Sequence, residues 1–289
     1  MKILIVSPYY APYSRVGSVR MVSLSRYLAE QGHAITVFAL ERKSLEEEVG
    51  ADCLTTPDPP NVEIVRYSVP NGAHLHYVKR DRLHLKYFRK QIDQLLSYRH
   101  FDILLVSCGP FYPLRYMKEI KKKYAIPYIV DYRDLDVLNA APETPSLLVK
   151  LKRRIVAIHK FIVENQCAQN AAHIVVVCPG DGEKIRKSFH IPASKITTIF
   201  NGYDETVLPE KKAVSTRPFG DSVHIGYFGK FMYCSPERGA WLLEAINSLR
   251  SQGIDVALHH IGTPNPLIAN YIEKNELDPK IYVGYGDMN

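Results

Sequence analysis

The sequence predicts an α/β protein with one complete doubly wound domain, built on a parallel sheet, followed by the first part of a second such domain. Short β-branched runs alternate with amphipathic helical stretches through most of the 289 residues. A stretch that mixes Pro, Gly, Ser and charge then precedes a new strand, turn and helix. We therefore expect a first domain over 1–200, a linker over 201–222 and an incomplete second domain over 223–289.

The expected strands are short apolar runs that alternate with helices. Those of the first domain are KILIVS, GHAITVFAL, VEIVRY, FDILLVS, IPYIVD, HIVVVC and ITTIF. Helical periodicity predicts helices between them over 19–31, 83–97, 112–124, 145–171 and 182–189. The second domain is expected to have strands VHIGYF, DVALHHIG and KIYVG, with helices over 237–252 and 267–274. Helices that carry the chain back between strands favour parallel pairing.

The net charge, the apolar content and the cysteine spacing limit which partners, location and kinds of site the sequence predicts. The net charge of +7 and the isoelectric point near 9.0 favour an anionic partner: a phosphorylated small molecule, a membrane surface or nucleic acid. No window approaches 18 consecutive apolar residues, and Met1 leads directly into a strand, so the sequence predicts a cytoplasmic protein. The five cysteines lie far apart without a C-x-x-C pair, so neither a disulfide framework nor a zinc site is indicated.

Ligands of doubly wound sheets bind outside the carboxyl ends of the strands, so the loops there are the candidate sites. Gly17, flanked by Arg15 and Arg20, begins a helix whose N–H groups would face a phosphate. The alternative is an ordinary glycine turn with solvated arginines. After FDILLVS the loop continues through Ser107 to Pro110, and its Cys108 is expected to be a packed small residue rather than a nucleophile.

Two further loops concentrate charge. The stretch VDYRDLD contains Asp131, Arg133, Asp134 and Asp136; the carboxylates could hold sugar hydroxyls or act as bases, and Arg133 could pair with a carboxylate or phosphate. An internal ion-pair network is the equally weighted alternative. In the second domain, Lys230 and Arg238 bracket a glycine turn and suit a diphosphate, or are simply exposed loop charges.

A basic amphipathic stretch bears on partners. Six Lys or Arg and one Asp lie between Lys79 and Lys90, and Leu85, Phe88, Ile92 and Leu95 follow helical spacing. Such a helix could rest peripherally on an anionic membrane at its inner face, or pack into the core with a solvated basic face. No motif for nucleic-acid binding occurs, so no nucleic-acid partner is expected.

Four segments in order resemble the GT-B glycosyltransferases, and specifically the retaining family four of bacterial surface-polysaccharide enzymes. They are KILIVSPYYAPYSRVGSVRMVSLSRYLAEQGHAITVFA, IVDYRDL, ITTIFNGYDETVL and IGYFGKFMYCSPERGAWLLEAINSL. The resemblance covers nearly the whole chain. It implies a GT-B-like fold, with one complete Rossmann-like domain and part of a second.

The resemblance also implies the reaction and its residues. A nucleotide-diphosphate sugar would bind mainly to the second domain and a glycan or lipid-linked acceptor to the first, with retention of configuration and with neither metal nor other cofactor. Asp131 and Asp134 would be catalytic. Donor phosphates would contact Gly17, Arg15, Lys230 and Arg238; the acceptor would contact Arg20, Ser107, Gly109 and Arg133; the hinge would be Asn201, Gly202 and Asp204.

The sequence departs from the family in two ways. Relatives place a histidine where this chain has SCGPF, so Asp131 or Asp134 would have to serve instead. A pair of glutamates expected in the donor domain is absent, so we expect little or no transferase activity from the isolated chain. It would be a fragment, a chain completed by a partner that covers the second sheet, or a non-catalytic binding remnant. An epimerase of the same fold is a further alternative; an oxidoreductase is disfavoured by Ile185 at a glycine position of VVVCPGDGEKI.

Overall fold

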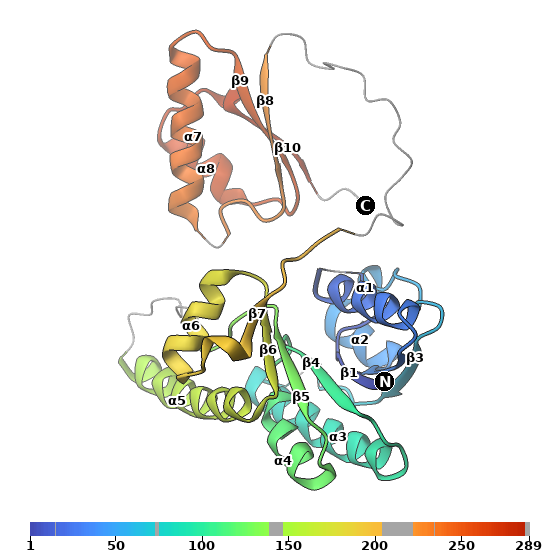
Figure 1. Ribbon diagram of the computed structural model, residues 1–289. Helices are drawn as coiled ribbons and strands as arrows, with labels where there is room; N and C mark the ends of the chain where they lie inside the picture. Colours follow the sequence, from blue (N-terminus) through green and yellow to red (C-terminus); the bar gives the residue numbers. More distant parts are fainter. Residues whose placement is uncertain (15, 73–74, 139–146, 204–221, 234, 287–289) are drawn as a thin grey trace. The chain divides into compact units, whose positions relative to one another are not determined.

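The computed structural model describes residues 1–14, 16–72, 75–138, 147–203, 222–233 and 235–286 (Figure 1). The chain divides into two compact units, Met1–Val207 and Leu208–Asn289. The strands of the first unit are β1 (Lys2–Val6), β2 (Ala34–Leu40), β3 (Glu63–Tyr67), β4 (Ile103–Ser107), β5 (Tyr128–Tyr132), β6 (His173–Val176) and β7 (Ile196–Thr198). Its helices are α1 (Val16–Glu30), α2 (Arg42–Val49), α3 (Tyr77–Tyr98), α4 (Leu114–Tyr124), α5 (Leu147–Asn170) and α6 (Pro179–Phe189).

The first unit is a seven-stranded sheet in the order β3-β2-β1-β4-β5-β6-β7, and every pair is parallel. The direction of strand order reverses between β1 and β4. In open sheets of this kind that reversal leaves a crevice at the carboxyl ends, where ligands bind. The predicted α/β class and Rossmann-like first domain are confirmed.

The core lies on both faces of this sheet because alternate strand residues point to opposite sides. Ile3 and Ile5 of β1 pack with Met21 of α1 on one face. Leu4 and Val6 belong to the larger core on the other face, which α3, α4, α5 and α6 cover with side chains that include Phe88, Ile120, Ala168 and Ile185. Because both faces of the sheet are buried, the strands have nearly continuous apolar sequences.

Two helices differ from the prediction. Helix α2 was not predicted, because RKSLEEEV carries too few apolar residues for a periodic signal; the hydroxyl of Ser44 donates to the Val69 carbonyl, and Leu45 is buried. Helix α3 begins at Tyr77, six residues before the predicted start at Leu83. Its apolar residues Phe88, Ile92 and Leu95 lie in the core. Across the part of the chain that the structure covers, no helix is long and apolar enough to cross a membrane.

The second unit has a three-stranded parallel sheet in the order β10-β9-β8. Its elements are β8 (Val223–Phe228), α7 (Pro236–Ser251), β9 (Val256–Ile261), α8 (Pro266–Lys274) and β10 (Tyr282–Gly286). Both helices lie on one side of the sheet, over a core that includes Leu243, Leu258 and Ile268 (Figure 1). No helix of the described residues covers the other side, where Phe228 and Tyr285 are exposed.

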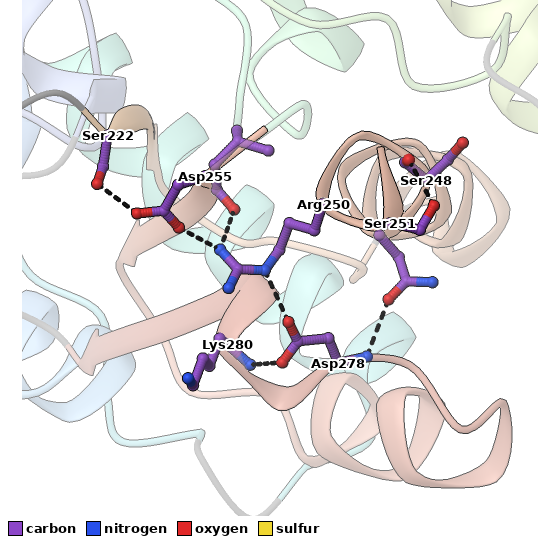
Figure 2. A network of polar contacts seen from close by, with 9 residues as sticks. Ser222, Ser248, Arg250, Ser251, Asp255, Asp278 and Lys280 are labelled. Carbon is purple, nitrogen blue, oxygen red and sulfur yellow. Dashed lines mark hydrogen bonds and ion pairs between the residues drawn. The ribbon is translucent and has the colours of Figure 1, made fainter. Parts of the chain in front are cut away.

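An arginine network ties together the amino ends of these three strands (Figure 2). Arg250, in the last turn of α7, donates from Nε to Asp278 and from Nη1 to Asp255, at 2.7 and 2.6 Å. Asp255 also accepts from the Ser222 hydroxyl, and Asp278 accepts from the backbone N–H of Lys280 at 2.9 Å. Ser222 precedes β8, Asp255 precedes β9, and Asp278 precedes the short turn that leads into β10.

Candidate functional site

The loops that follow β1, β4 and β5 meet at the carboxyl edge of the first sheet, beside the switch point. Arg133, just after β5, reaches back across this edge. Its Nη1 donates to the carbonyl of Gly17 at 2.6 Å, and its Nη2 donates to the carbonyl of Gly109 at 3.4 Å. One guanidinium therefore joins the loop after β1, at the start of α1, to the loop after β4.

Both glycines leave room for the Arg133 guanidinium, which a Cβ atom at either position would displace. A Cβ atom at Gly17 would lie 2.5 Å from Nη1 of Arg133, and one at Gly109 would lie 2.4 Å from its Nη2. Gly109 also has φ of +93°, a conformation that L residues with side chains rarely adopt. The contact with Arg133 thus gives a structural reason for two glycines that the sequence assigned to ligand binding.

Arg20 and Asp131 form a buried ion pair next to this contact. Arg20 Nη2 lies 2.9 Å from Asp131 Oδ1, and its Nε donates to both carboxylate oxygens at 3.2 and 3.1 Å. The Asp131 side chain is 2% exposed and that of Arg20 is 11% exposed. The remaining Arg20 donor, Nη1, contacts the Phe200 carbonyl and Asn201 Oδ1 at 3.3 and 3.2 Å. A predicted catalytic residue, an acceptor residue and a hinge residue are thereby brought together.

The ion pair lines a pocket of about 280 Å³ on the α1 face of the sheet, near the carboxyl ends of β5, β6 and β7. Its polar groups come from Arg20 and Asp131, together with Ser23 and Asn201. The other lining residues are Val19, Leu24, Leu105, Val175, Ile199, Gly202 and Tyr203. An apolar pocket with a few convergent polar groups is the usual form of a small-molecule site.

The remaining predicted residues are more scattered. Asp134 is 66% exposed and accepts a hydrogen bond from Arg133 Nε at 3.2 Å. Ser107 is buried at the end of β4. Lys230 and Arg238 are exposed in the second unit, in the loop after β8 and the first turn of α7. Arg15 and Asp204 lie outside the described residues.

The structure agrees with the expectation that Cys108 is a packed residue rather than a nucleophile. The side chain is fully buried, and burial raises its pKa well above the ordinary value. Since the thiolate is the reactive form, this residue is unsuited to act as a nucleophile.

Sequence reasoning missed two buried polar residues near the site. Ser18, at the start of α1, has a buried hydroxyl that bonds to nothing within the described ranges. Glu164 of α5 is 3% exposed, and burial, followed by repulsion from Asp136, raises its pKa to about 7. A signal for Glu164 existed, because it shares a helical stripe with Cys167, Ala168 and Ala171, which are all buried.

A family comparison identifies the chain. The model of Glycosyltransferase Family 4 matches residues 17–207, which include Gly17, Arg20, Asp131 and Arg133. The chain belongs to glycosyltransferase family 4. No curated protein matches it.

Solved structures agree with this family-4 glycosyltransferase in fold. The sucrose-phosphate synthase of Thermosynechococcus elongatus has a TM-score of 0.66 at 13% identity, over 100% of this chain and 71% of that one. WaaG, a glycosyltransferase involved in lipopolysaccharide biosynthesis, has a TM-score of 0.57 at 12% identity, over 99% and 70%. A putative UDP-N-acetylglucosamine 2-epimerase from Listeria monocytogenes has 0.52 at 12%, over 100% and 70%. The fold is therefore GT-B-like, as predicted.

Proposed function

We propose that this chain acts in the transfer of a sugar, with retention, from a nucleotide-diphosphate sugar to a glycan or lipid-linked acceptor in surface-polysaccharide synthesis. Membership of family 4 supports the reaction class. The observation that carries the proposal is the buried Arg20–Asp131 pair, which lines a pocket at the ligand-binding edge of the sheet. A sugar transferase needs such an edge to present charged groups to hydroxyls and phosphates.

The site residues have distinct roles in this proposal. Asp131 holds an acceptor hydroxyl or takes its proton, with Arg20 fixing the carboxylate, and Asp134 is the second candidate base. The N-terminal turn of α1 at Gly17 binds the donor phosphates, and Arg15, which lies outside the described residues, is the predicted cation of this contact. Lys230 and Arg238 of the second unit stabilise the departing diphosphate by charge, without a metal or other cofactor.

The uncovered side of the second sheet supports a completing partner. Parallel sheets are normally covered on both faces. Here Phe228 is 75% exposed, and His259 on the same side bonds to His224 and Tyr285, at 2.6 and 2.7 Å. We propose that a further polypeptide segment, continuous with this chain or supplied by a second protein, covers this side. The chain as given is then expected to show little or no turnover by itself.

The basic side of α3 supports a place for the reaction at the inner face of a cytoplasmic membrane. Its residues Phe88, Ile92 and Leu95 are in the core, so the contact would depend mainly on charge. The exposed cations are Lys79, Arg82, Lys86, Arg89 and Lys90. Attraction of such a cluster to anionic lipid would bring the site near a lipid-linked acceptor.

The proposal is tested on the polypeptide recovered from its native host, after its intact mass has been measured. It is incubated with labelled UDP-, GDP-, ADP- and dTDP-hexoses and a lipid extract of the same host. Transfer of label from one donor to lipid or glycan, with the anomeric configuration kept, is the expected result. Release of free epimerised sugar would establish the epimerase instead, and no turnover with any donor would leave only a binding role.

A further inference from the structure

A second pocket, of about 230 Å³, lies at the same carboxyl edge on the opposite face of the first sheet. It adjoins the site already described, because its wall residue Pro110 directly follows Gly109, whose carbonyl accepts from Arg133. The walls come from the loops after β1, β4 and β5 and from α2, α3, α4 and α5. The volume is below the roughly 300–1,000 Å³ of sites for drug-sized ligands, so it suits one sugar ring.

Aromatic side chains form the apolar part of this second pocket. Tyr9, Phe111 and Tyr112 all line it. The Tyr112 hydroxyl is hydrogen-bonded to Tyr67 at 2.5 Å, and the Tyr9 hydroxyl donates to Glu48 at 2.7 Å, so both rings are held in place. The negative face of an aromatic ring attracts the slightly positive C–H groups on one side of a sugar ring.

Three polar groups of this pocket lack partners among the residues that the structure describes. Oε2 of Glu48 and Nδ1 of His84 are buried without a hydrogen bond, and His84 as a whole is only 6% exposed. The half-buried guanidinium of Arg80, also in the wall, has no hydrogen bond or ion pair in these same parts of the chain. Buried polar groups left unpaired are costly, so two of them beside a half-buried unpaired arginine in one small pocket indicate a missing polar ligand.

The other charges in the wall are already paired. Arg115 lies 2.7 Å from Asp81, and Lys160 lies 2.7 Å from Asp136. These pairs leave Arg80 as the cation available to a ligand, while Glu48 can accept from a hydroxyl. Burial lowers the pKa of His84, so its ring is neutral near pH 7 and can also bond a hydroxyl. The ligand that satisfies all three groups has hydroxyls and one negative group.

We propose that this second pocket binds a sugar unit of the acceptor next to the one that reacts, and that this unit is an acidic sugar whose carboxylate or phosphate pairs with Arg80. This inference rests on the proposed transferase function only where it identifies the bound sugar as part of the acceptor. The binding of an acidic sugar in this pocket does not depend on that function. Glu48 and His84 hold the ring hydroxyls, Tyr9 and Phe111 contact its apolar side, and Arg80 selects acidic over neutral sugars.

The test is ligand-observed NMR titration of the full 289-residue chain, without any sugar donor. The probes are glucuronate, glucose 6-phosphate, glucose and inorganic phosphate, at millimolar concentrations. We expect one of the two acidic sugars to bind at least tenfold more tightly than both glucose and inorganic phosphate. Which of the two binds distinguishes a carboxylate from a phosphate as the negative group.

Variants assign the binding to this pocket. Arg80→Gln is expected to weaken the acidic sugar at least tenfold, because a hydrogen bond between two charged groups is lost. Arg42→Gln, an exposed arginine of α2 outside the pocket, is the matched control and should leave binding unchanged. Glu48→Gln should weaken acidic and neutral sugars alike. Equal binding of glucose and the acidic sugars, an unaffected Arg80→Gln variant, or no binding of either acidic sugar would overturn the inference.

Failure here and failure of the proposed function are distinguishable. The titration involves no turnover, so an inactive chain can still bind the acidic sugar through Arg80. Conversely, a chain that transfers sugar to a neutral acceptor keeps the proposed function and refutes the acidic-sugar subsite.

Discussion

The two units each contain an arginine that binds aspartate side chains, but at opposite ends of their sheets. In the first unit, Arg20 meets Asp131 at the carboxyl edge, and both side chains are almost entirely buried. In the second, Arg250 meets Asp255 and Asp278 at the amino edge, where these carboxylates are 65% and 35% exposed (Figure 2). Arginine–aspartate pairing therefore occurs once beside a pocket and once at the surface, where it connects the starts of strands.

The difference in burial indicates that the Arg20–Asp131 pair serves ligand binding, whereas the Arg250 network serves folding. Moving two charges out of water is costly, and apolar residues of similar size often stabilise a protein as well as a buried ion pair does. A buried pair beside a pocket is thus better explained by what it offers a ligand. The Arg250 network stays hydrated and connects the starts of three strands, which explains it through the structure alone.

The largest effect is expected from breaking the buried pair. Arg20→Ala leaves the carboxylate of Asp131 buried without its cation, at a cost of about 3–5 kcal/mol in the free energy of unfolding. This loss of stability is measured by urea unfolding of the first unit, monitored through hydrogen exchange in peptides that contain β5. Arg186→Ala, which removes an exposed pair with Glu183, is the control and should change little. Equal losses in the free energy of unfolding for the two substitutions would contradict the proposed difference between the buried and the exposed ion pair.

A smaller effect, with a distinctive pH dependence, is expected at Glu164. Its folded-state pKa, about 7, exceeds the ordinary value of 4.5. Between these values the unfolded chain loses the proton while the folded chain keeps it, so stability falls as pH rises, by up to about 3 kcal/mol.

The substitution Glu164→Gln should remove this decline and make the first unit more stable than wild type at pH 8. Urea unfolding at pH 5 and pH 8 measures it. Glu119→Gln, at an exposed position of α4, should keep the wild-type decline. If the Glu164 variant declines like wild type, the buried carboxyl does not titrate as described.

The smallest effect is expected in the second unit, with the opposite dependence on pH. The pKa of Asp255 is lowered by hydrogen bonds from Ser222 and Arg250, and that of Asp278 by its bond from Arg250. Their stabilisation is present above the ordinary pKa of 3.8 and is lost as pH falls through the lowered values. Arg250→Ala should lower the urea midpoint of this unit at pH 7, and by less at pH 2, while loss of the bond from its Nη1 to the Val256 carbonyl does not depend on pH.

The matched control for this last prediction is Lys280→Ala. Asp278 accepts from the backbone N–H of residue 280, which alanine retains, so the midpoint should hardly move. A midpoint difference between wild type and Arg250→Ala that is as large at pH 2 as at pH 7 would contradict an ionic origin of the network.

Much of the fold could be predicted from sequence, because each described strand overlaps an apolar run. Helix α2 could not, since tertiary contacts of Ser44 and Leu45 hold it rather than a periodic face. Within the candidate site, Arg20 and Asp131 were both singled out, but their pairing spans 111 residues and no local spacing reveals it. The second pocket was missed because Glu48 lies on the unpredicted helix and Arg80 was interpreted only as one cation of a basic helical stretch.

If the Arg20–Asp131 pair serves the reaction rather than stability, removing both charges should abolish turnover without unfolding the protein. The most direct test is the turnover of the native-host polypeptide carrying Arg20→Met and Asp131→Leu together, with the lipid extract and donor that support wild-type transfer. We expect a double variant that unfolds at nearly the wild-type urea concentration, because both charges are removed, yet has lost turnover by about 100-fold or more. A double variant that folds normally and turns over within about threefold of wild type, far less than general acid–base catalysis contributes, would contradict the account.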